Sequence, residues 1–488
     1  MKGKVKIMSE GVVFENNIPN KSLMLEKIAN GTIMKYGFRH KEEQSTQEET
    51  YRTEIRRQRD KILYTGGFRR LQDKTQVMSA TLTGDHRTRL THTLEVEQIA
   101  VSVADALGLN KDLVSVIALG HDVGHTPFGH SAERTLNKLL EDNGGFHHPI
   151  QSVKYLWEKY GNNLIDEIYE GILAHDSDMF TINKEKAKNQ LQWSDYYSKE
   201  NHDTPKKCLY LEKFLNEVPS TLEAQAVIWA DKIAYITHDL EDFLRSPIYI
   251  SVVKSEGKTN IIESELCKIL GNLIEKPLQR ITDFESRDLI RAITTDLILA
   301  STKNINNIDC LEQEMVQKKT KERLNSKESN KKKRYLDSLI INFNDNFRDN
   351  YYKLRELLDE KYIFSPEVQR SDAKAQKIVS YLYREFVENY RLLPLEFRIK
   401  IDDETRKIAK EILYANVMSE EDINAIISKK PKEMEKELKL KIHSIDDYKK
   451  TKTNIITRIV ASYISTMSDT YAENIFCNLN ASKDNYSL

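Results

Sequence analysis

The spacing of apolar residues along the chain predicts helices. Val96, Ile99, Val103 and Leu107 recur at the three- and four-residue intervals of one helical face. A second apolar helix is expected over Leu113 to Leu119, where it runs straight into a group of polar residues. Alternation of apolar and polar residues, which is typical of strands, does not extend over any useful length. We therefore expect an all-α fold.

Glycine divides the chain into two unequal parts. Most of the 17 glycines lie between Gly66 and Gly171, and none follows Gly271. Because glycine permits tight backbone turns, chemistry that depends on such turns is expected in the first half. The second half is predicted to consist of long helices joined by charged loops.

Three polar, lysine-rich segments interrupt this pattern: 181–207, 317–334 and 429–441. Each is expected to be an exposed helix face or a loop, because charged runs are usually solvated. The segment 317–334 ends in Lys-Lys-Lys-Arg and is the best candidate for a basic contact. The first segment, 181–207, is interpreted as an insertion.

Composition narrows the class of protein. The formal net charge of the 488 residues is -1, with 39% hydrophobic and 31% charged residues, which gives no overall bias toward nucleic acid or a membrane surface. No window approaches the roughly 18 apolar residues of a membrane span. The N-terminus lacks the apolar segment of a secretory signal, so we expect a cytoplasmic protein.

The cysteines exclude one kind of metal site. Cys208, Cys267, Cys310 and Cys477 are far apart and form no Cys-x-x-Cys pair. They are interpreted as unpaired thiols in a reducing compartment. A metal site in this chain must therefore be built from histidines and carboxylates.

The first candidate for such a site is His92. It falls one turn before Val96 on the same helical face, so its imidazole is expected to point inward. A single inward histidine is often an ordinary core residue, and its interpretation depends on what other groups lie nearby.

A much denser signal follows the second apolar helix. Residues 120–130, GHDVGHTPFGH, contain three histidines and one aspartate, punctuated by three glycines. Gly124 and Pro127 are expected to end the helix. The adjacent His121 and Asp122 would then stand at a rigid helix end, where both can ligate one divalent ion.

A third signal lies in residues 229–239, WADKIAYITHD. Asp231, Tyr235 and Asp239 are spaced four residues apart and line one helical face. Two carboxylates and a phenol that face a core are typical of a functional site. Taken alone, this segment fits an amphipathic surface helix equally well.

Together these signals give the pattern His…His-Asp…Asp, formed by His92, His121, Asp122 and Asp231, after which the HD superfamily is named. Longer blocks resemble the dGTP triphosphohydrolase family and span nearly the whole chain. These blocks are RTEIRRQRDKILYTGGFRRLQDKTQV, GDHRTRLTHTLEV, HDVGHTPFGHSAE, GGFHH, ADKIAYITHDLED, LYREFVENYRLLP and VASYISTMSDTYA. The chain is similar, more distantly, to the sterile-alpha-motif HD dNTPases.

This resemblance implies a domain organisation. It comprises an N-terminal extension over 1–50, an HD-type helical catalytic core over 51–250, and additional C-terminal helices over 251–488. The C-terminal region would complete the nucleotide site and make the contacts of a homo-oligomer, either a tetramer or a hexamer.

The resemblance also implies a reaction and its cofactor. Family members hydrolyse a deoxynucleoside triphosphate at the α-phosphate to the deoxynucleoside and inorganic triphosphate, and dGTP is the favoured substrate. One divalent ion would be held by His92, His121, Asp122 and Asp231. Mg²⁺ or Mn²⁺ is expected first, with Fe, Co, Ni or Zn as alternatives, because a His₂Asp₂ set accommodates several ions.

Further roles are carried over residue by residue. His130 and Glu133, three apart on one helical face, would transfer a proton or position water, and His125 joins them as a catalytic residue. The substrate contacts implied are Arg89 and Lys232 to the phosphates, His148 beside the triphosphate, Tyr235 and Asp239 to the sugar, and Gln76 near the sugar and base.

Two alternative functions stay open. One is a different HD-domain phosphohydrolase, such as a nucleotidase or a phosphodiesterase. The other is a non-catalytic regulator that binds nucleotides or single-stranded DNA. Either ligand is also a candidate allosteric partner of an active enzyme, and no membrane partner is expected. The base preferred among the dNTPs is open too.

Overall fold

The computed structural model describes residues 53–76, 87–176, 180, 183–192, 207–255, 261–308, 313–325, 331–416, 418–441 and 445–480. These residues form helices, and the only β-type pairing among them is an isolated bridge between Thr75 and Thr88. The all-α prediction is thereby confirmed. The expected N-terminal extension, 1–50, lies outside the described residues.

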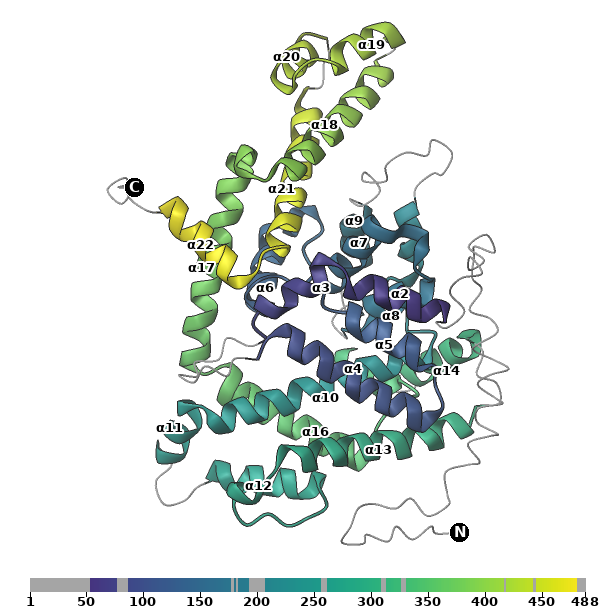
Figure 1. Cartoon of the computed structure of the whole chain (residues 1–488), viewed down its shortest axis with the longest axis vertical. Coiled ribbons are helices and arrows are strands. Elements are labelled where there is room, and N and C mark those ends of the chain that lie inside the picture. The colour runs from purple at the N-terminus through teal and green to yellow at the C-terminus, as the bar shows by residue number, and fades with distance from the viewer. Residues whose placement is uncertain are drawn as a thin grey trace.

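The first half of the chain forms a compact layer of helices around α10, the helix that carries the third sequence signal (Figure 1). The helix α10 packs against α4, α5 and α8, and α2 packs against α5. The helices of this part are α2 (Glu54–Leu63), α3 (Gly66–Arg70), α4 (Arg89–Leu107), α5 (Lys111–Gly120), α6 (Gly129–Leu139), α7 (His148–Tyr160), α8 (Asp166–Ala174), α9 (Lys184–Gln192) and α10 (Leu222–Arg245).

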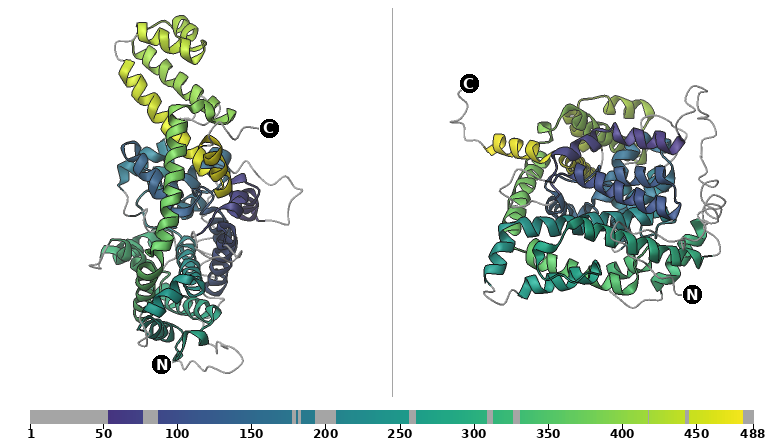
Figure 2. Two further views of the ribbon diagram at one scale, coloured as in Figure 1. Left: turned by 90° about the vertical axis from the view of Figure 1, so that its left-hand side faces the viewer. Right: turned by 60° about the horizontal axis from the view of Figure 1, so that its bottom comes forward.

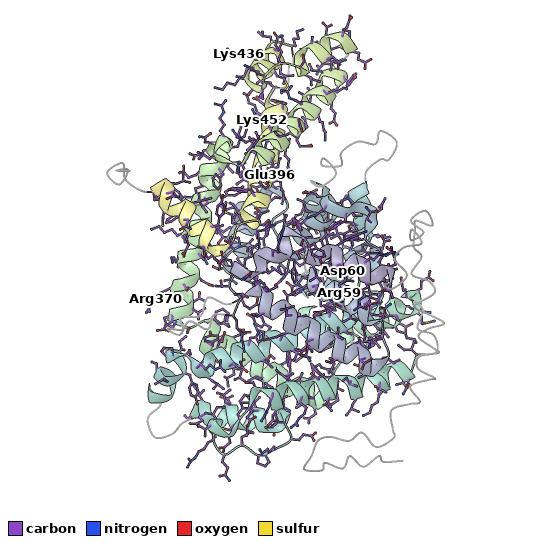
Figure 3. All side chains as sticks on the ribbon, viewed as in Figure 1. Arg59, Asp60, Arg370, Glu396, Lys436 and Lys452 are labelled. Carbon is purple, nitrogen blue, oxygen red and sulfur yellow. The ribbon has the colours of Figure 1, made fainter. Side chains whose placement is uncertain are left out.

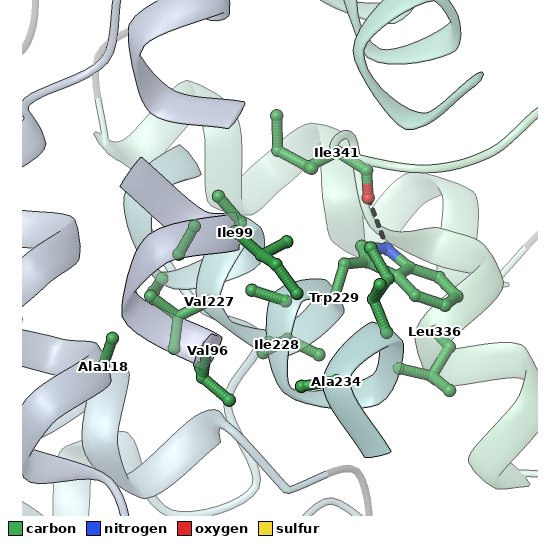
Figure 4. Packing of buried hydrophobic residues seen from close by; sticks show 14 of the residues in the cluster. Val96, Ile99, Ala118, Val227, Ile228, Trp229, Ala234, Leu336 and Ile341 are labelled. Carbon is green, nitrogen blue, oxygen red and sulfur yellow. Dashed lines mark hydrogen bonds between the residues drawn. The ribbon is translucent and has the colours of Figure 1, made fainter. Parts of the chain in front are cut away.

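The interface between α4 and α10 is the centre of the hydrophobic core. Val96 and Ile99 of α4 meet Val227 and Ile228 of α10, and all four are buried (Figure 4). Trp229 is fully buried as well, and its indole Nε1 donates to the carbonyl of Ile341 at 2.7 Å. This bond satisfies the one polar group of the ring, and it ties the late chain to α10.

The next helices cover α4 and α10 from the other side. The helix α13 packs against both of them, and α12 packs against α16. Most of these elements lie in the lower part of Figure 1. They are α11 (Pro247–Ser255), α12 (Ile261–Leu273), α13 (Ser286–Asn306), α14 (Gln313–Asn325), α15 (Lys331–Ser338) and α16 (Asp345–Leu358). Their buried side chains belong to the same hydrophobic cluster as the first half, which runs from Ile55 to Val368.

The last helices form a second hydrophobic cluster and a projecting arm. The helices α18 to α21 extend away from the body, as two views show (Figures 1 and 2). The elements are α17 (Pro366–Glu388), α18 (Leu395–Ala415), α19 (Glu420–Ile427), α20 (Pro431–Lys441), α21 (Ile445–Ser465) and α22 (Asp469–Asn480). The side chains of Lys436 and Lys452 mark the arm in Figure 3, and Lys452 pairs with Glu435 at 3.0 Å.

One helix of the first half belongs to this second cluster. Phe128, Ala132 and Leu136, at the start of α6 and along it, pack with the apolar residues of α17 to α22. The expected boundary at residue 250, between a catalytic core and a C-terminal region, stays a prediction. The hydrophobic packing instead changes near Pro366, where α17 begins.

The lysine-rich segments include helices with one buried face. Ala187 and Leu191 of α9, Val316 and Leu324 of α14, and Met434 of α20 are buried. Residues 181–182, 193–206 and 326–330 of these segments lie outside the described part, as do the side chains of the basic run 331–334.

Short helical turns connect these elements. The 3₁₀ turns are η2 (Leu71–Asp73), η3 (Glu141–Asn143), η4 (Gly161–Asn163), η7 (Lys207–Phe214), η9 (Ile281–Asp283) and η11 (Tyr390–Leu392), and η10 (Asp359–Ile363) is a π-helical turn. Cys267 and Cys477 are free thiols, as expected, whereas the side chains of Cys208 and Cys310 lie outside the described part.

Candidate active site

The four predicted metal ligands meet where α4, the end of α5 and α10 come together. His92 Nε2 lies 3.0 Å from Asp231 Oδ1, and the same oxygen lies 3.9 Å from His121 Nε2. Asp122 Oδ2 is 3.6 Å from His121 Nε2. Ligand atoms this close can share one ion, because nitrogen and carboxylate ligands bind at about 2.0–2.2 Å. His92, His121 and Asp231 are thus close enough to share one ion, and Asp122 forms a second such group with His121 and His175.

The end of α5 presents His121 in the form that a metal ion requires. The helix ends at Gly120, slightly before the expected position, and His121 is its C-cap. Its Nδ1 donates to the carbonyl of Ala118 at 2.6 Å, so the proton of a neutral ring is on Nδ1. The lone pair of Nε2 then faces the cluster. Among the described residues this buried atom has no hydrogen-bond partner, which fits a divalent cation as its missing partner.

The turn after His121 is fixed by close contact with α7. The backbone N–H of Gly124 donates to Ser152 Oγ at 3.0 Å, and that hydroxyl donates to the carbonyl of His121 at 2.8 Å. A Cβ at Gly124 would lie 2.2 Å from the backbone nitrogen of Ser152. Glycine is therefore required here by packing, since any side chain would push α7 off the site.

Neighbouring side chains keep the two carboxylates ionised. Burial alone would raise the pKa of Asp122, but His121 and Arg89 outweigh it and keep that pKa well below its ordinary value. Arg89 Nη1 donates to Asp122 Oδ2 at 2.6 Å. Burial is likewise outweighed at Asp231, whose pKa is lowered well below its ordinary value by Lys232 and by the hydrogen bond from His92. Both groups can therefore ligate a cation at neutral pH.

The predicted acid/base residues form a second cluster around Glu133 of α6. His130 Nδ1 donates to Glu133 Oε2 at 3.0 Å, so a neutral His130 ring keeps its lone pair on Nε2. The other carboxylate oxygen, Oε1, accepts from both the backbone N–H and the Nδ1 of His148, at 2.7 and 2.9 Å. These bonds and the charge of His148 overcome burial and lower the pKa of Glu133 well below its ordinary value.

His148 contacts a residue that the sequence reasoning missed. Its Nε2 lies 3.0 Å from Nε2 of His175, the C-cap of α8. His175 Nδ1 donates to the carbonyl of Ile172 at 2.6 Å, so His175 Nε2 can only accept. With Glu133 accepting at Nδ1, His148 donates from both ring nitrogens and is an imidazolium. Burial lowers its pKa, but Glu133 dominates and raises that pKa to about 9.

A signal for His175 was present in the sequence. Residues 173–176 read LAHD, and residues 119–122 read LGHD. In both places an apolar helix ends at a histidine followed by an aspartate. In both, Nδ1 is bonded to the carbonyl three residues earlier, and Nε2 points into the site. The two imidazoles are neighbours, with ring centroids 4.9 Å apart.

His125 lies between the two clusters and is fully buried. Its Nε2 is 3.9 Å from Glu133 Oε2, and this nitrogen has no hydrogen-bond partner among the described residues. Burial, together with the positive charge of Arg89, lowers its pKa well below the ordinary value. His125 is therefore a neutral imidazole at neutral pH.

The side chains predicted to contact the sugar are farther along α10. The guanidinium of Arg355 lies 4.3 Å from the ring centroid of Tyr235, and Arg355 Nη1 donates to Asp239 Oδ2 at 3.1 Å. Arg355 comes from α16 and was not singled out in the sequence. Burial raises the pKa of Asp239 to about 7 despite this arginine.

Two remaining predicted contacts flank the metal ligands. Lys232 Nζ lies 3.3 Å from Asp231 Oδ2 and 3.7 Å from Asp176 Oδ1. Gln76 is buried beside the start of α6, where its carbonyl would lie 3.2 Å from a Cβ at Gly129. The roles of Lys232 and Gln76, like those of the other predicted site residues, stay predictions.

One more ionisable pair borders His92. His238 of α10 is bonded through Nε2 to Glu95 of α4, and its ring lies 5.6 Å from that of His92. Burial and the neighbouring His92 lower the pKa of His238 to about 2, so this ring is neutral. The pair joins α4 to α10 at the edge of the metal cluster.

Comparison with known proteins gives the same assignment as the geometry. Residues 89–236 match the HD domain, and residues 341–413 match the phosphohydrolase-associated domain. The chain is 33% identical over 373 residues to a deoxyguanosinetriphosphate triphosphohydrolase-like protein of Rickettsia rickettsii (strain Iowa), covering 74% of this chain and 87% of the relative. A similarly named protein of Rickettsia canadensis (strain McKiel) is 33% identical over 376 residues, covering 72% and 86%.

The helical fold and the His…His-Asp…Asp cluster define an HD-domain phosphohydrolase with a candidate site for a divalent metal ion. The chain belongs to the dGTP triphosphohydrolase family of that superfamily. None of the described helices has the length and apolarity that a membrane crossing requires.

Proposed function

We propose that this protein hydrolyses deoxynucleoside triphosphates to the deoxynucleoside and inorganic triphosphate, with dGTP as the first substrate to test. One observation carries the proposal. A metal-ligand cluster and a hydrogen-bonded acid/base cluster share an edge, because His148 Nε2 is 3.7 Å from Asp122 Oδ1 and His148 also bonds Glu133. The names of the Rickettsia relatives supply the substrate class.

The reaction requires charge neutralisation and proton transfer. Water attacks the α-phosphorus, the new P–O bond forms as the bond to the 5′-oxygen breaks, and that oxygen gains a proton. A divalent ion held by His92, His121, Asp122 and Asp231, with Mg²⁺ or Mn²⁺ proposed first, would supply positive charge against the phosphate oxygens.

The chain's own residues would supply the rest. Nε2 of His130 carries the lone pair that can take a proton from water, since Nδ1 is committed to Glu133. The imidazolium of His148 adds a fixed positive charge for the triphosphate. Arg89 and Lys232 would add two more, and the neutral His125 a hydrogen-bond acceptor.

The sugar would lie along α10. The ring of Tyr235 would pack against C2′ and leave no room for a 2′-hydroxyl, which favours deoxyribose by steric exclusion. Asp239 would accept a hydrogen bond from the 3′-hydroxyl. Gln76, whose Oε1 has no hydrogen-bond partner among the described residues, would face the sugar and base.

The test is product analysis. The purified protein is incubated with each dNTP and NTP and with Mg²⁺ or Mn²⁺, and the phosphate products are separated. Release of intact triphosphate supports the proposal. Release of monophosphate or pyrophosphate assigns a different HD phosphohydrolase. His121→Ala is the negative control, because it removes one ligand and should lose both metal and turnover.

A further inference from the structure

Residues 125–129 form the loop between the predicted metal ligands and α6. Hydrogen bonds connect this loop to the C-terminal helices α21 and α22. Nζ of Lys74, which is buried, donates to the carbonyl of His125 at 2.5 Å and to the carbonyl of Ser465 at 2.8 Å. Ser465 is the last residue of α21. One lysine thus connects the end of the projecting arm to the active-site loop.

A second connection starts at Asp469, the first residue of α22. Its Oδ1 accepts from the backbone N–H of Phe128 at 2.8 Å. Its Oδ2 accepts from the backbone N–H and the hydroxyl of Thr75, at 3.0 and 2.7 Å. The carboxylate therefore bridges two segments that each lead directly to a predicted site residue, because Phe128 is two residues from His130 and Thr75 precedes Gln76.

The backbone at Phe128 needs an external restraint. Its φ is +56°, in the left-handed region that residues other than glycine rarely adopt. Gly129 follows with φ +60°. The helix α6 begins there without a capping side chain from its own chain segment. The bond from Phe128 to Asp469 thus fixes the direction in which α6 starts, and so the place of His130.

We propose that Asp469 is a positioning residue for the reaction, which sets His130 and Gln76 relative to the metal ligands through Phe128 and Thr75. This inference rests on the proposed function, because positioning is catalytic only if His130 is. Asp469 touches none of the reacting groups.

The first experiment compares Asp469→Ala and Asp469→Asn with a matched control. Glu473→Gln changes a carboxylate on the same helix that pairs with Lys374 of α17 at 2.7 Å, away from the loop. Asp469→Ala should lower kcat by about 10- to 100-fold, because small displacements of reacting groups have effects of this size. KM should change less, and metal content should stay at the wild-type level.

The asparagine variant should fall between wild type and Asp469→Ala, since its amide oxygen can accept from only one of the two segments. It also keeps the test valid if the alanine variant does not fold. Glu473→Gln should behave as wild type. Equal losses in Asp469→Asn and Glu473→Gln, or no loss in either alanine or asparagine variant, would overturn the proposal.

A double substitution separates positioning from general weakening of the fold. If Asp469 acts through His130, adding Asp469→Ala to His130→Ala should lower kcat by little more than His130→Ala alone. If the two losses multiply in full, Asp469 does not act through His130, and the proposal is wrong.

Hydrogen–deuterium exchange tests the same restraint without any substrate. Peptides that cover 125–130 should exchange faster in Asp469→Ala than in wild type, because the Phe128 amide loses its acceptor, and Glu473→Gln should leave them unchanged. Unaltered exchange in Asp469→Ala overturns the inference. If wild type hydrolyses no nucleotide but this exchange changes as expected, the proposed function fails while the restraint by Asp469 stands.

Discussion

The Nε2 atoms of His148 and His175 lie 3.0 Å apart in the buried space between α7 and α8. Because His175 Nε2 can only accept, this contact gives the His148 imidazolium its second hydrogen bond, opposite Glu133. A charged donor buried without an acceptor is costly. His175 is therefore a structural requirement for a positive charge next to Asp122.

This relationship predicts the effect of removing His175. His175→Ala should lower kcat by roughly 10- to 100-fold, because a hydrogen bond to a charged group contributes about 1.5–3 kcal/mol. His175→Gln should recover part of the loss, since its amide oxygen can accept from His148. Turnover and bound metal are measured in both variants. Bound metal should be retained in both, and its loss in His175→Ala would instead make His175 a metal ligand.

The ring of Tyr235, on which Arg355 stacks, gives a prediction about the choice between deoxyribose and ribose. Tyr235→Ala removes the ring that would exclude a 2′-hydroxyl, so the ratio of kcat/KM for dGTP to that for GTP should fall, by about 10-fold or more. Tyr235→Phe keeps the ring and should keep the ratio. An unchanged ratio in Tyr235→Ala would place the selection of deoxyribose elsewhere.

Glu170 of α8 predicts a dependence of stability on pH. Its carboxyl is buried against Ser220, whose N–H and hydroxyl lie at 3.0 and 2.6 Å. Burial raises its pKa to about 7 from an ordinary 4.5, although Ser220 opposes the shift. The folded state therefore binds a proton more tightly than the unfolded state. This contribution is fully present below the unfolded pKa and is lost as pH rises through the folded pKa.

The free energy of unfolding should accordingly fall between pH 4.5 and 7, by about 3 kcal/mol at most for this group. Glu170→Gln can accept from the Ser220 N–H through its amide oxygen and donate to the Ser220 hydroxyl through its NH₂ without titrating, so it should remove this part of the fall. Denaturant unfolding of both proteins below and above the interval measures it. Parallel pH profiles in the two proteins would show that Glu170 is ionised at little cost.

The sequence predicted the site where the signal was local. His92, His121 and Asp122 stand at helix ends or on helix faces that apolar spacing defines, and the His130–Glu133 pair is one helical turn. His175 was missed even though it repeats the helix-end pattern of His121, because a single histidine outside a dense run of histidines and glycines looks like a core residue.

The remaining contacts have no local pattern. Lys74 and Ser465 are 391 positions apart, and Phe128 and Asp469 are 341 apart. Such pairs exist only after α6 has packed against the C-terminal helices. The same packing places α6 in the second hydrophobic cluster, so helices could be predicted from spacing, whereas their assignment to two clusters could not.

His130 and Glu133 form the predicted acid/base pair, and the structure changes which of their two substitutions should lower kcat more. If His130 transfers a proton, His130→Ala should lower kcat by about 10²-fold or more. Metal and nucleotide binding should persist, since the His130 side chain is 40% exposed and is not one of the four proposed metal ligands. Lys138→Ala, on the exposed face of α6, is the control.

For an isolated His130–Glu133 pair, Glu133→Gln would be the milder change, because an amide can still orient the ring. In the folded protein, however, the two oxygens of Glu133 accept from three N–H groups, two of them from His148. A glutamine would set its own NH₂ against at least one of these donors and remove the charge that holds His148 protonated. Glu133→Gln should therefore lower kcat at least as much as His130→Ala. A clearly smaller loss would show that the His148 charge does not contribute to turnover and that Glu133 serves His130 alone.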